Sequence, residues 1–126
     1  MGESAGRTIM VVEDYDDTRI MLKRMLEARG YLVLEAVNGQ EAVEVATRAR
    51  PDLILMDLDL PIIDGIEATN RIRRNAGLKG VPIIAVTAYP MSFTRVRAFS
   101  QGCSGYVEKP IDFPTLNGLI EKHLRP

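Results

Sequence analysis

The sequence has one cysteine, one histidine and almost no net charge. A disulfide needs two cysteines, so Cys103 forms no intrachain bridge, and one thiol is too few for a cysteine-based zinc site. The formal net charge is −1, from 16 Lys and Arg against 17 Asp and Glu. This balance gives no reason to expect non-specific binding to nucleic acids or to membranes. We expect Cys103 to be a small buried hydrophobic residue.

Long hydrophobic runs are missing as well. No apolar run approaches the roughly 20 residues that a membrane-spanning helix requires. The N-terminal segment MGESAGR lacks the apolar centre of a signal peptide, so we expect a cytoplasmic protein. The 126 residues, of which 46% are hydrophobic, suit a single domain over residues 1–126, with a loose tail over residues 1–6.

Five short β-rich runs alternate with five helical patterns. The runs are TIMVVE (8–13), YLVLEA (31–36), DLILMD (52–57), VPIIAVT (81–87) and GYVEK (105–109). They are mostly continuous rather than alternating in apolar residues, which is typical of strands covered on both faces of a parallel sheet. Apolar residues at helical spacing predict helices over 16–29, 39–49, 65–75, 91–101 and 113–124. This order predicts a doubly wound α/β fold built from five (βα) units.

The polar residues at the predicted helix ends have ordinary structural explanations. In the first helix, Asp16 and Asp17 suit the N-cap, and Gly30 suits the stop. The apolar stripe of this helix would consist of Met21, Leu22, Met25 and Leu26. Asp64 suits a turn or the N-cap of the third helix. The lone His123 suits the C-terminal end of the last helix, where a cation favours the helix dipole.

Polar residues also gather at the carboxyl ends of four predicted strands. In an open α/β sheet, ligands bind beyond these ends, so the residues there are candidate site residues. They are Glu13 and Asp14 after the first strand, Asp57 at the third, Thr87 at the fourth and Lys109 at the fifth. The second strand ends without a charge, which fits an edge position outside the site. Each residue alone could be a cap, a turn residue or solvated surface, but their convergence favours a site.

This set of side chains is suited to phosphoryl transfer. Three carboxylates within a few ångströms repel one another, and a bound divalent cation removes that cost. Hard oxygen ligands with few protein contacts suit Mg²⁺, which readily shares its coordination with a phosphate. An Asp can attack phosphorus to form an acyl phosphate, while Lys and Thr stabilise the charge on the phosphoryl oxygens.

Four motifs occur in the order, and at the strand ends, that are typical of one known family. They are VVEDYDD (11–17), DLDLPIIDG (57–65), VTA (86–88) and GYVEKP (105–110). With them, the chain resembles the response-regulator receiver domains of two-component signalling, of the single-domain, chemotaxis-regulator-like type. The resemblance extends from about Thr8 to Leu124, and it implies a flavodoxin-like fold whose five parallel strands lie in the order 2-1-3-4-5.

The resemblance also implies a role for each candidate residue. Asp57 would accept a phosphoryl group from a histidine kinase or a histidine phosphotransfer protein. Mg²⁺, with Mn²⁺ as the alternative, would be held by Asp14, Asp57, the backbone carbonyl of Asp59 and, through a water, Glu13. Thr87 and Lys109 would hold the phosphoryl oxygens.

Further residues would control a switch and the lifetime of the phosphate. Tyr106 would turn inward when Thr87 moves toward the phosphate, which changes a partner-binding face formed by the fourth helix, the fifth strand and the fifth helix. The side chains of Asp59 and Tyr89 occupy positions that tune dephosphorylation in this family, and the Lys109–Pro110 bond would be cis. The domain would assist its own phosphorylation and dephosphorylation without being an enzyme. Its downstream protein target is unknown, and dimer formation stays open.

Two other functions remain open from the residues. The sequence DLD (57–59) after an apolar strand is similar to the Asp-x-Asp motif of aspartate-nucleophile phosphatases of the haloacid-dehalogenase type. In those enzymes the nucleophile follows the first strand, whereas here an acidic pair precedes Asp57. A pseudo-receiver used only for docking would normally lack the acceptor Asp or the Lys, and both are present.

Overall fold

The computed structural model describes residues 6–88 and 91–125, without the side chains of residues 91–93. The elements are β1 (Thr8–Val12), α1 (Asp16–Ala28), β2 (Leu32–Ala36), α2 (Gly39–Ala49), β3 (Leu53–Asp57), α3 (Gly65–Arg74), a 3-10 helix η1 (Ala76–Leu78), β4 (Ile83–Thr87), α4 (Met91–Ser100), β5 (Gly105–Glu108) and α5 (Phe113–Leu124). The sequence pattern predicts all of them except η1.

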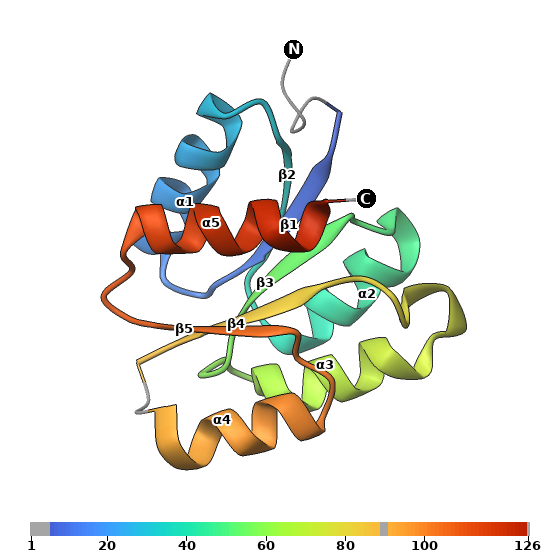
Figure 1. Ribbon diagram of the computed structural model, residues 1–126. Helices are drawn as coiled ribbons and strands as arrows, with labels where there is room; N and C mark the ends of the chain where they lie inside the picture. The colour runs from blue at the N-terminus through green and yellow to red at the C-terminus, as the bar shows by residue number, and fades with distance from the viewer. Residues whose placement is uncertain (1–5, 89–90, 126) are drawn as a thin grey trace.

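The five strands form one parallel sheet in the order β2-β1-β3-β4-β5, which confirms the predicted order. Figure 1 shows α1 and α5 on one face of the sheet, and α2, α3 and α4 on the other. All residues of β3 and β4 are buried, whereas β2 begins at the exposed Leu32 and lies at an edge, as predicted. The chain therefore has the predicted doubly wound, flavodoxin-like α/β fold.

Two apolar layers fill the space between the sheet and the helices. Successive side chains of a strand point to opposite faces, so β3 contributes Leu53 and Leu55 to one layer and Ile54 and Met56 to the other. Cys103 is buried in the second layer, which confirms its predicted apolar environment. Each large apolar side chain buried in this way contributes roughly 1.5–3 kcal/mol, so packing holds the strand ends in place.

The parallel register brings the carboxyl ends of the central strands to the same edge of the sheet. Asp57 at the end of β3 lies opposite Val86 of β4. Beyond β5, the Lys109 N–H donates to the carbonyl of Thr87 at 2.7 Å. The polar residues that follow these strands are therefore neighbours in space.

The start of α1 and its apolar stripe differ from the sequence prediction. The N-cap residue is Tyr15, which makes no side-chain capping bond, and Asp16 and Asp17 lie in the first turn. The capping role predicted for these two acids is wrong, although their charges still favour the helix dipole. Met21 is 44% exposed, because the buried face is narrow and only Leu22 and Leu26 of this helix are fully covered.

Other predicted features are confirmed. Gly30 follows α1 with a positive φ of 94°, and its N–H donates to the carbonyl of Glu27 at 3.0 Å, which ends the helix. Asp64 caps α3 by accepting a hydrogen bond from the Glu67 N–H at 2.8 Å. The Lys109–Pro110 bond is cis.

No helix in the described ranges is both long and apolar enough to cross a membrane.

Candidate functional site

Three carboxylates meet at the carboxyl edge of the sheet. Oxygen atoms of Glu13, Asp14 and Asp57 all lie within 4.8 Å of one another. Glu13 and Asp57 are only 3% and 4% exposed, whereas Asp14 lies at the surface. We call these three residues the acidic cluster. The structure thus brings together the carboxylates that follow the first and third strands in the sequence.

The ammonium group of Lys109 lies against the acidic cluster. Its Nζ is 2.7 Å from Oε1 of Glu13 and 3.5 Å from Oδ2 of Asp57. The other carboxylate oxygen of Glu13 accepts a hydrogen bond from the Tyr15 N–H at 3.1 Å. Both oxygens of Glu13 therefore have protein partners, and its action on a metal through water stays a prediction.

Burial and hydrogen bonding give the two buried carboxylates different proton affinities. Burial, assisted by the nearby Glu13 and opposed by the hydrogen bond from the Asp59 N–H, raises the pKa of Asp57 to about 7. Burial also acts to raise the pKa of Glu13, but the hydrogen bonds from Lys109 and Tyr15 outweigh it and lower that pKa. Near neutral pH, the metal-free chain therefore holds an ionised Glu13 and an Asp57 that is protonated in part of the molecules.

The donor set of the acidic cluster fits a divalent cation. The exposed carboxylate of Asp14 has no hydrogen bond or ion pair among the residues that the structure describes. A cation between Asp14 and Asp57 would add positive charge to that of Lys109 and would favour the ionised form of Asp57. Oxygen ligands alone suit Mg²⁺. The Asp59 N–H donates to Oδ1 of Asp57 at 3.0 Å, and metal binding by the Asp59 carbonyl stays a prediction.

The two residues of the predicted switch lie on neighbouring strands. Thr87 is fully buried at the end of β4, and Tyr106 is half-buried on β5. Tyr106 packs against the apolar layer under α2, α3 and α4, and the side chain of Thr94 on α4 acts to lower the pKa of its hydroxyl. Burial raises the pKa of Tyr106. Tyr89, a predicted tuning residue, lies outside the described residues.

The loop between β3 and α3 packs closely against the backbone of Asp57. A side chain at Gly65 would place its Cβ 2.2 Å from the carbonyl oxygen of Asp57, so this position requires glycine. The Gly65 N–H donates to the carbonyl of Leu58 at 3.1 Å, which closes the loop. The sequence shows the Asp-Gly pair as a motif, but the close approach that explains it appears only in the structure.

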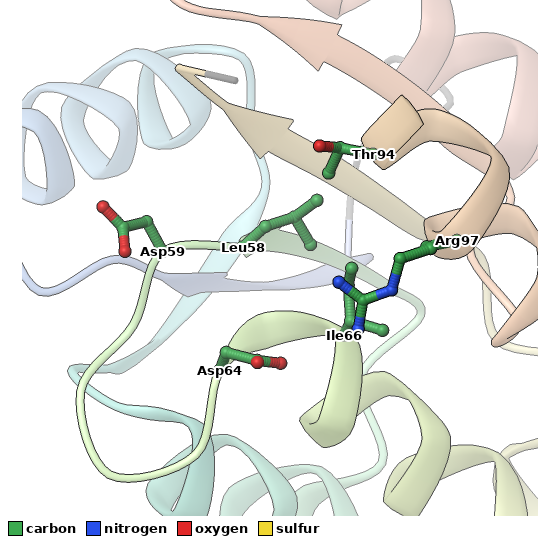
Figure 2. Close-up of a pocket in the computed structure, with 6 residues that line it drawn as sticks. All are labelled: Leu58, Asp59, Asp64, Ile66, Thr94 and Arg97. Atoms are coloured by element: carbon green, nitrogen blue, oxygen red, sulfur yellow. The ribbon is translucent and has the colours of Figure 1, made fainter. Parts of the chain in front are cut away.

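A cleft lies between this loop and α4, and we call it the Arg97 cleft. It has a volume of about 330 Å³ and is lined by Leu58, Asp59, Asp64, Ile66, Thr94 and Arg97. Figure 2 shows Arg97 reaching from α4 toward Ile66, with Asp59 and Asp64 on the loop. No ion pair joins Arg97 to another described residue. Sequence reasoning did not identify Thr94 or Arg97, because neither lies at the end of a strand.

One family model and several known relatives match most of the chain. The family model described as "Response regulator receiver domain" matches residues 9–121. The "Polar-differentiation response regulator DivK" of Brucella anthropi is 37% identical over 118 residues, covering 94% of this chain and 96% of the relative. The protein of the same name from Brucella ovis is 36% identical over the same shares of the two chains.

Solved structures of similar sequence have the same fold. The receiver domain of the sensor histidine kinase PA1611 from Pseudomonas aeruginosa PAO1 is 36% identical, with a TM-score of 0.88 over 95% of this chain and 98% of that chain. That structure has a magnesium ion coordinated in its active site cleft. A LuxR-family response regulator from Aurantimonas sp. SI85-9A1 is 39% identical, with a TM-score of 0.85 over 93% of this chain and 84% of that chain.

Proposed function

Because this chain belongs to the response regulator receiver domain family, we propose that Asp57 accepts a phosphoryl group from a phosphohistidine on a partner protein. The chain is a receiver domain of a two-component response regulator, a phosphoacceptor signalling domain and not a classical enzyme. The acidic cluster carries the proposal, because Asp57 is a buried carboxylate at the end of a central strand, beside Asp14 and Lys109. We further propose that the whole chain is one receiver domain and acts in the cytoplasm.

In the proposed reaction, a carboxylate oxygen of Asp57 bonds to phosphorus as the bond between phosphorus and the donor imidazole breaks. The carboxylate must be ionised to attack, and since its pKa is about 7 in the metal-free chain, a bound proton must leave first. Mg²⁺, or Mn²⁺ in its place, would neutralise the phosphoryl oxygens when held by Asp14, Asp57, the carbonyl of Asp59 and, through a water, Glu13.

Lys109 and Thr87 would bind the phosphoryl oxygens. Lys109 pairs with Glu13 at 2.7 Å and lies 3.5 Å from Asp57, so it would exchange its contact with Glu13 for one with the phosphoryl group. Thr87 would donate a hydrogen bond from its hydroxyl group to a phosphoryl oxygen. Because these groups stabilise charge on the phosphoryl oxygens, they would let the domain assist its own phosphorylation and dephosphorylation.

The lifetime of the phosphate and the switch would depend on further residues. The side chain of Asp59 is exposed near the acceptor and, with Tyr89, would adjust access of the attacking water. Movement of Thr87 toward the phosphoryl group would open space for Tyr106 to turn inward. Tyr106 would then give up its interaction with Thr94, which would link phosphorylation to the position of α4.

The proposed output surface consists of α4, β5 and α5. Within α4, the sequence contains Arg95 and Arg97 and no acidic residue. The guanidinium carbon of Arg95 lies 5.5 Å from the ring centroid of Phe99, and both Phe99 and Val96 are exposed. This combination of cationic and apolar groups suits a downstream protein that offers acidic and apolar side chains, or, in a dimer, a second copy of the chain.

Acetyl phosphate with Mg²⁺ tests the proposed phosphoacceptor. The wild type should gain the mass of one phosphoryl group in intact mass spectrometry, because the small donor replaces the phosphohistidine. Asp57→Asn should gain none, since an amide is not a nucleophile of this kind. A wild type that stays unlabelled, or an Asp57→Asn variant that is labelled equally well, would contradict the proposal.

A further inference from the structure

Arg19 of α1 connects three parts of the chain next to the acidic cluster. Its Nη1 donates to the backbone carbonyl of Glu13 at 3.2 Å. Its Nη2 lies 2.8 Å from Oδ1 of Asp16 in the same helix, and its Nε lies 3.1 Å from Oε1 of Glu35 on the edge strand β2. Only 13% of the Arg19 side chain is exposed. The guanidinium therefore uses all three of its nitrogen atoms within the protein.

The hydrogen bond to Glu13 acts on the peptide that joins two members of the acidic cluster. Because a peptide unit is planar, holding the carbonyl oxygen of Glu13 also sets the direction in which Asp14 leaves the end of β1. A guanidinium is a rigid, planar donor, so less side-chain entropy is lost for each hydrogen bond that it forms. Arg19 is thus placed to control the orientation of Asp14.

The side chain of Asp14 has few contacts of its own that hold it near Asp57. In the described part of the chain, the Asp14 carboxylate has no hydrogen bond or ion pair. The N-cap residue that follows it, Tyr15, makes no side-chain capping bond. Without the bond from Arg19, the Glu13 N–H would still donate to the carbonyl of Ala36 at 3.0 Å and the Tyr15 N–H to the carboxylate of Glu13 at 3.1 Å. The carbonyl of Glu13 would be free to turn, and repulsion between the carboxylates would then carry Asp14 away from Asp57. Part of the free energy of cation binding would then be spent on bringing the carboxylates of Asp14 and Asp57 together, and the affinity would fall.

We propose that Arg19 is a positioning residue that orients Asp14 for divalent-cation binding. It does so by linking the Glu13 carbonyl to β2 through Glu35. The inference rests on the cation site proposed above for Asp14 and Asp57. Residues that support metal ligands without touching the metal typically contribute about 10–100-fold to affinity. Because Arg19 acts through a backbone carbonyl, we expect an effect at the lower end of this range.

A purely structural role would leave cation binding unchanged, and Lys23 provides a matched control for it. The Nζ of Lys23 lies 3.5 Å from Oε2 of Glu35, so Lys23 also joins α1 to β2. Lys23→Gln and Arg19→Gln each remove one positive charge from beside Glu35. Only Arg19→Gln also removes the donor to the Glu13 carbonyl.

Calorimetric titration of Mg²⁺ into the full chain measures the affinity. Arg19→Gln should weaken Mg²⁺ binding about tenfold, whereas Lys23→Gln should stay within about twofold of the wild type. The Mg²⁺ concentration for half-maximal labelling by acetyl phosphate should shift in parallel, while the labelling rate at saturating Mg²⁺ stays near that of the wild type. Equal losses in both variants, or unchanged affinity in Arg19→Gln, would overturn the proposal.

A measurement without metal tests the positioning itself. Amide hydrogen exchange at Tyr15, whose N–H is bound by the Glu13 carboxylate, should be faster in metal-free Arg19→Gln than in Lys23→Gln, because the loop opens more often. Equal exchange in these two variants would overturn the proposal. If circular dichroism shows that Arg19→Gln is unfolded, Arg19→Lys decides, since lysine keeps the charge but cannot span the three partners. Weaker Mg²⁺ binding by Arg19→Lys supports the proposal, and wild-type affinity overturns it.

The same titration separates this inference from the proposed function. A wild type that binds no Mg²⁺ would overturn the cation site itself. A wild type that binds Mg²⁺, with Arg19→Gln binding equally well, would overturn only the role of Arg19.

Discussion

The loop between β3 and α3 borders two groups of charged side chains in contrasting environments. In the acidic cluster, Glu13 and Asp57 are almost completely buried, and Lys109 lies against both. In the Arg97 cleft, Asp59 and Arg97 are exposed and form no ion pair with any described residue. The residue types are similar in the two places. Removal from water, rather than the number of acidic groups, prepares a carboxylate for chemistry.

Asp57 and Asp59 show this contrast most clearly, since only one residue separates them. The carboxylate of Asp57 lies in the acidic cluster, where burial raises its pKa to about 7. Asp59 has an exposed carboxylate and serves the cluster through its backbone, by donating its N–H to Asp57. In the proposed function, the buried carboxylates would make the acidic cluster responsive to a cation or a phosphoryl group, whereas solvent screens the charges of the Arg97 cleft.

Removing one basic side chain from the acidic cluster and one from the Arg97 cleft should give the largest difference in the free energy of unfolding. Lys109→Gln leaves the buried Glu13 without its ion-pair partner and should lower the free energy of unfolding by about 3 kcal/mol. Arg97→Gln removes an exposed cation and should change it by no more than about 0.5 kcal/mol. Urea unfolding at pH 7 without Mg²⁺ measures both. Equal losses would show that the two groups do not differ in the way that burial implies.

The free energy of unfolding should depend on pH through Asp57. The folded chain keeps the Asp57 proton up to a pKa of about 7, whereas an unfolded Asp titrates near about 4. The folded state therefore binds more protons between these values, and stability falls as pH rises, by up to about 1.4 kcal/mol per pH unit. Glu13, whose pKa is lowered, loses its contribution only as pH falls below its usual range.

Metal-free unfolding between pH 5 and 8 tests this pH dependence. Asp57→Asn lacks the titrating group, so it should gain stability relative to the wild type across this range, by on the order of 2 kcal/mol. Asp59→Asn is the control, since it removes a carboxylate from the same loop but not from the acidic cluster. Parallel curves for the wild type and Asp57→Asn would contradict the raised pKa.

Mg²⁺ should stabilise the chain through the acidic cluster and not through the cleft. At ten times its dissociation constant, a ligand that binds only the folded state adds about 1.4 kcal/mol. Asp14→Asn should lose most of this gain in thermal unfolding. Asp64→Asn should keep it, because an Asn side chain still caps α3. An equal loss of the Mg²⁺ effect in both variants would place the cation elsewhere.

Residue spacing predicts the fold and the strand ends well, but not the pairing among the side chains. Continuous apolar runs that end in Glu13, Asp57 and Thr87 show where strands stop, since parallel strands of one sheet end at one edge. The contact between Lys109 and Glu13 joins residues 96 positions apart that follow β1 and β5, two strands that are not neighbours in the sheet. Such a contact depends on side-chain rotamers that only the packed structure selects.

The first helix shows the limits of local patterns. Spacing indicates the contact of Arg19 with Asp16, one turn apart, but the bond from Arg19 to the Glu13 carbonyl depends on the path of the loop. The prediction for Asp16 as a cap is wrong because the helix begins at Asp16 itself. The last residue with an extended backbone is Tyr15, whose N–H is bound by Glu13. A stripe of apolar residues also does not reveal how much of the helix packs against the sheet, as the exposure of Met21 shows.

Borohydride reduction of the phosphorylated chain, followed by peptide mass spectrometry, identifies the aspartate that carries the phosphoryl group. Reduction converts the acyl phosphate carbon to an alcohol as the phosphate leaves, so the modified aspartate becomes homoserine. We expect homoserine at position 57 alone, in the wild type and in Asp59→Asn, because among the aspartates that the structure describes only Asp57 combines burial with a contact to Lys109. Homoserine at position 59 with an unmodified position 57 would contradict the central claim, that the buried carboxylate of the pair is the phosphoacceptor.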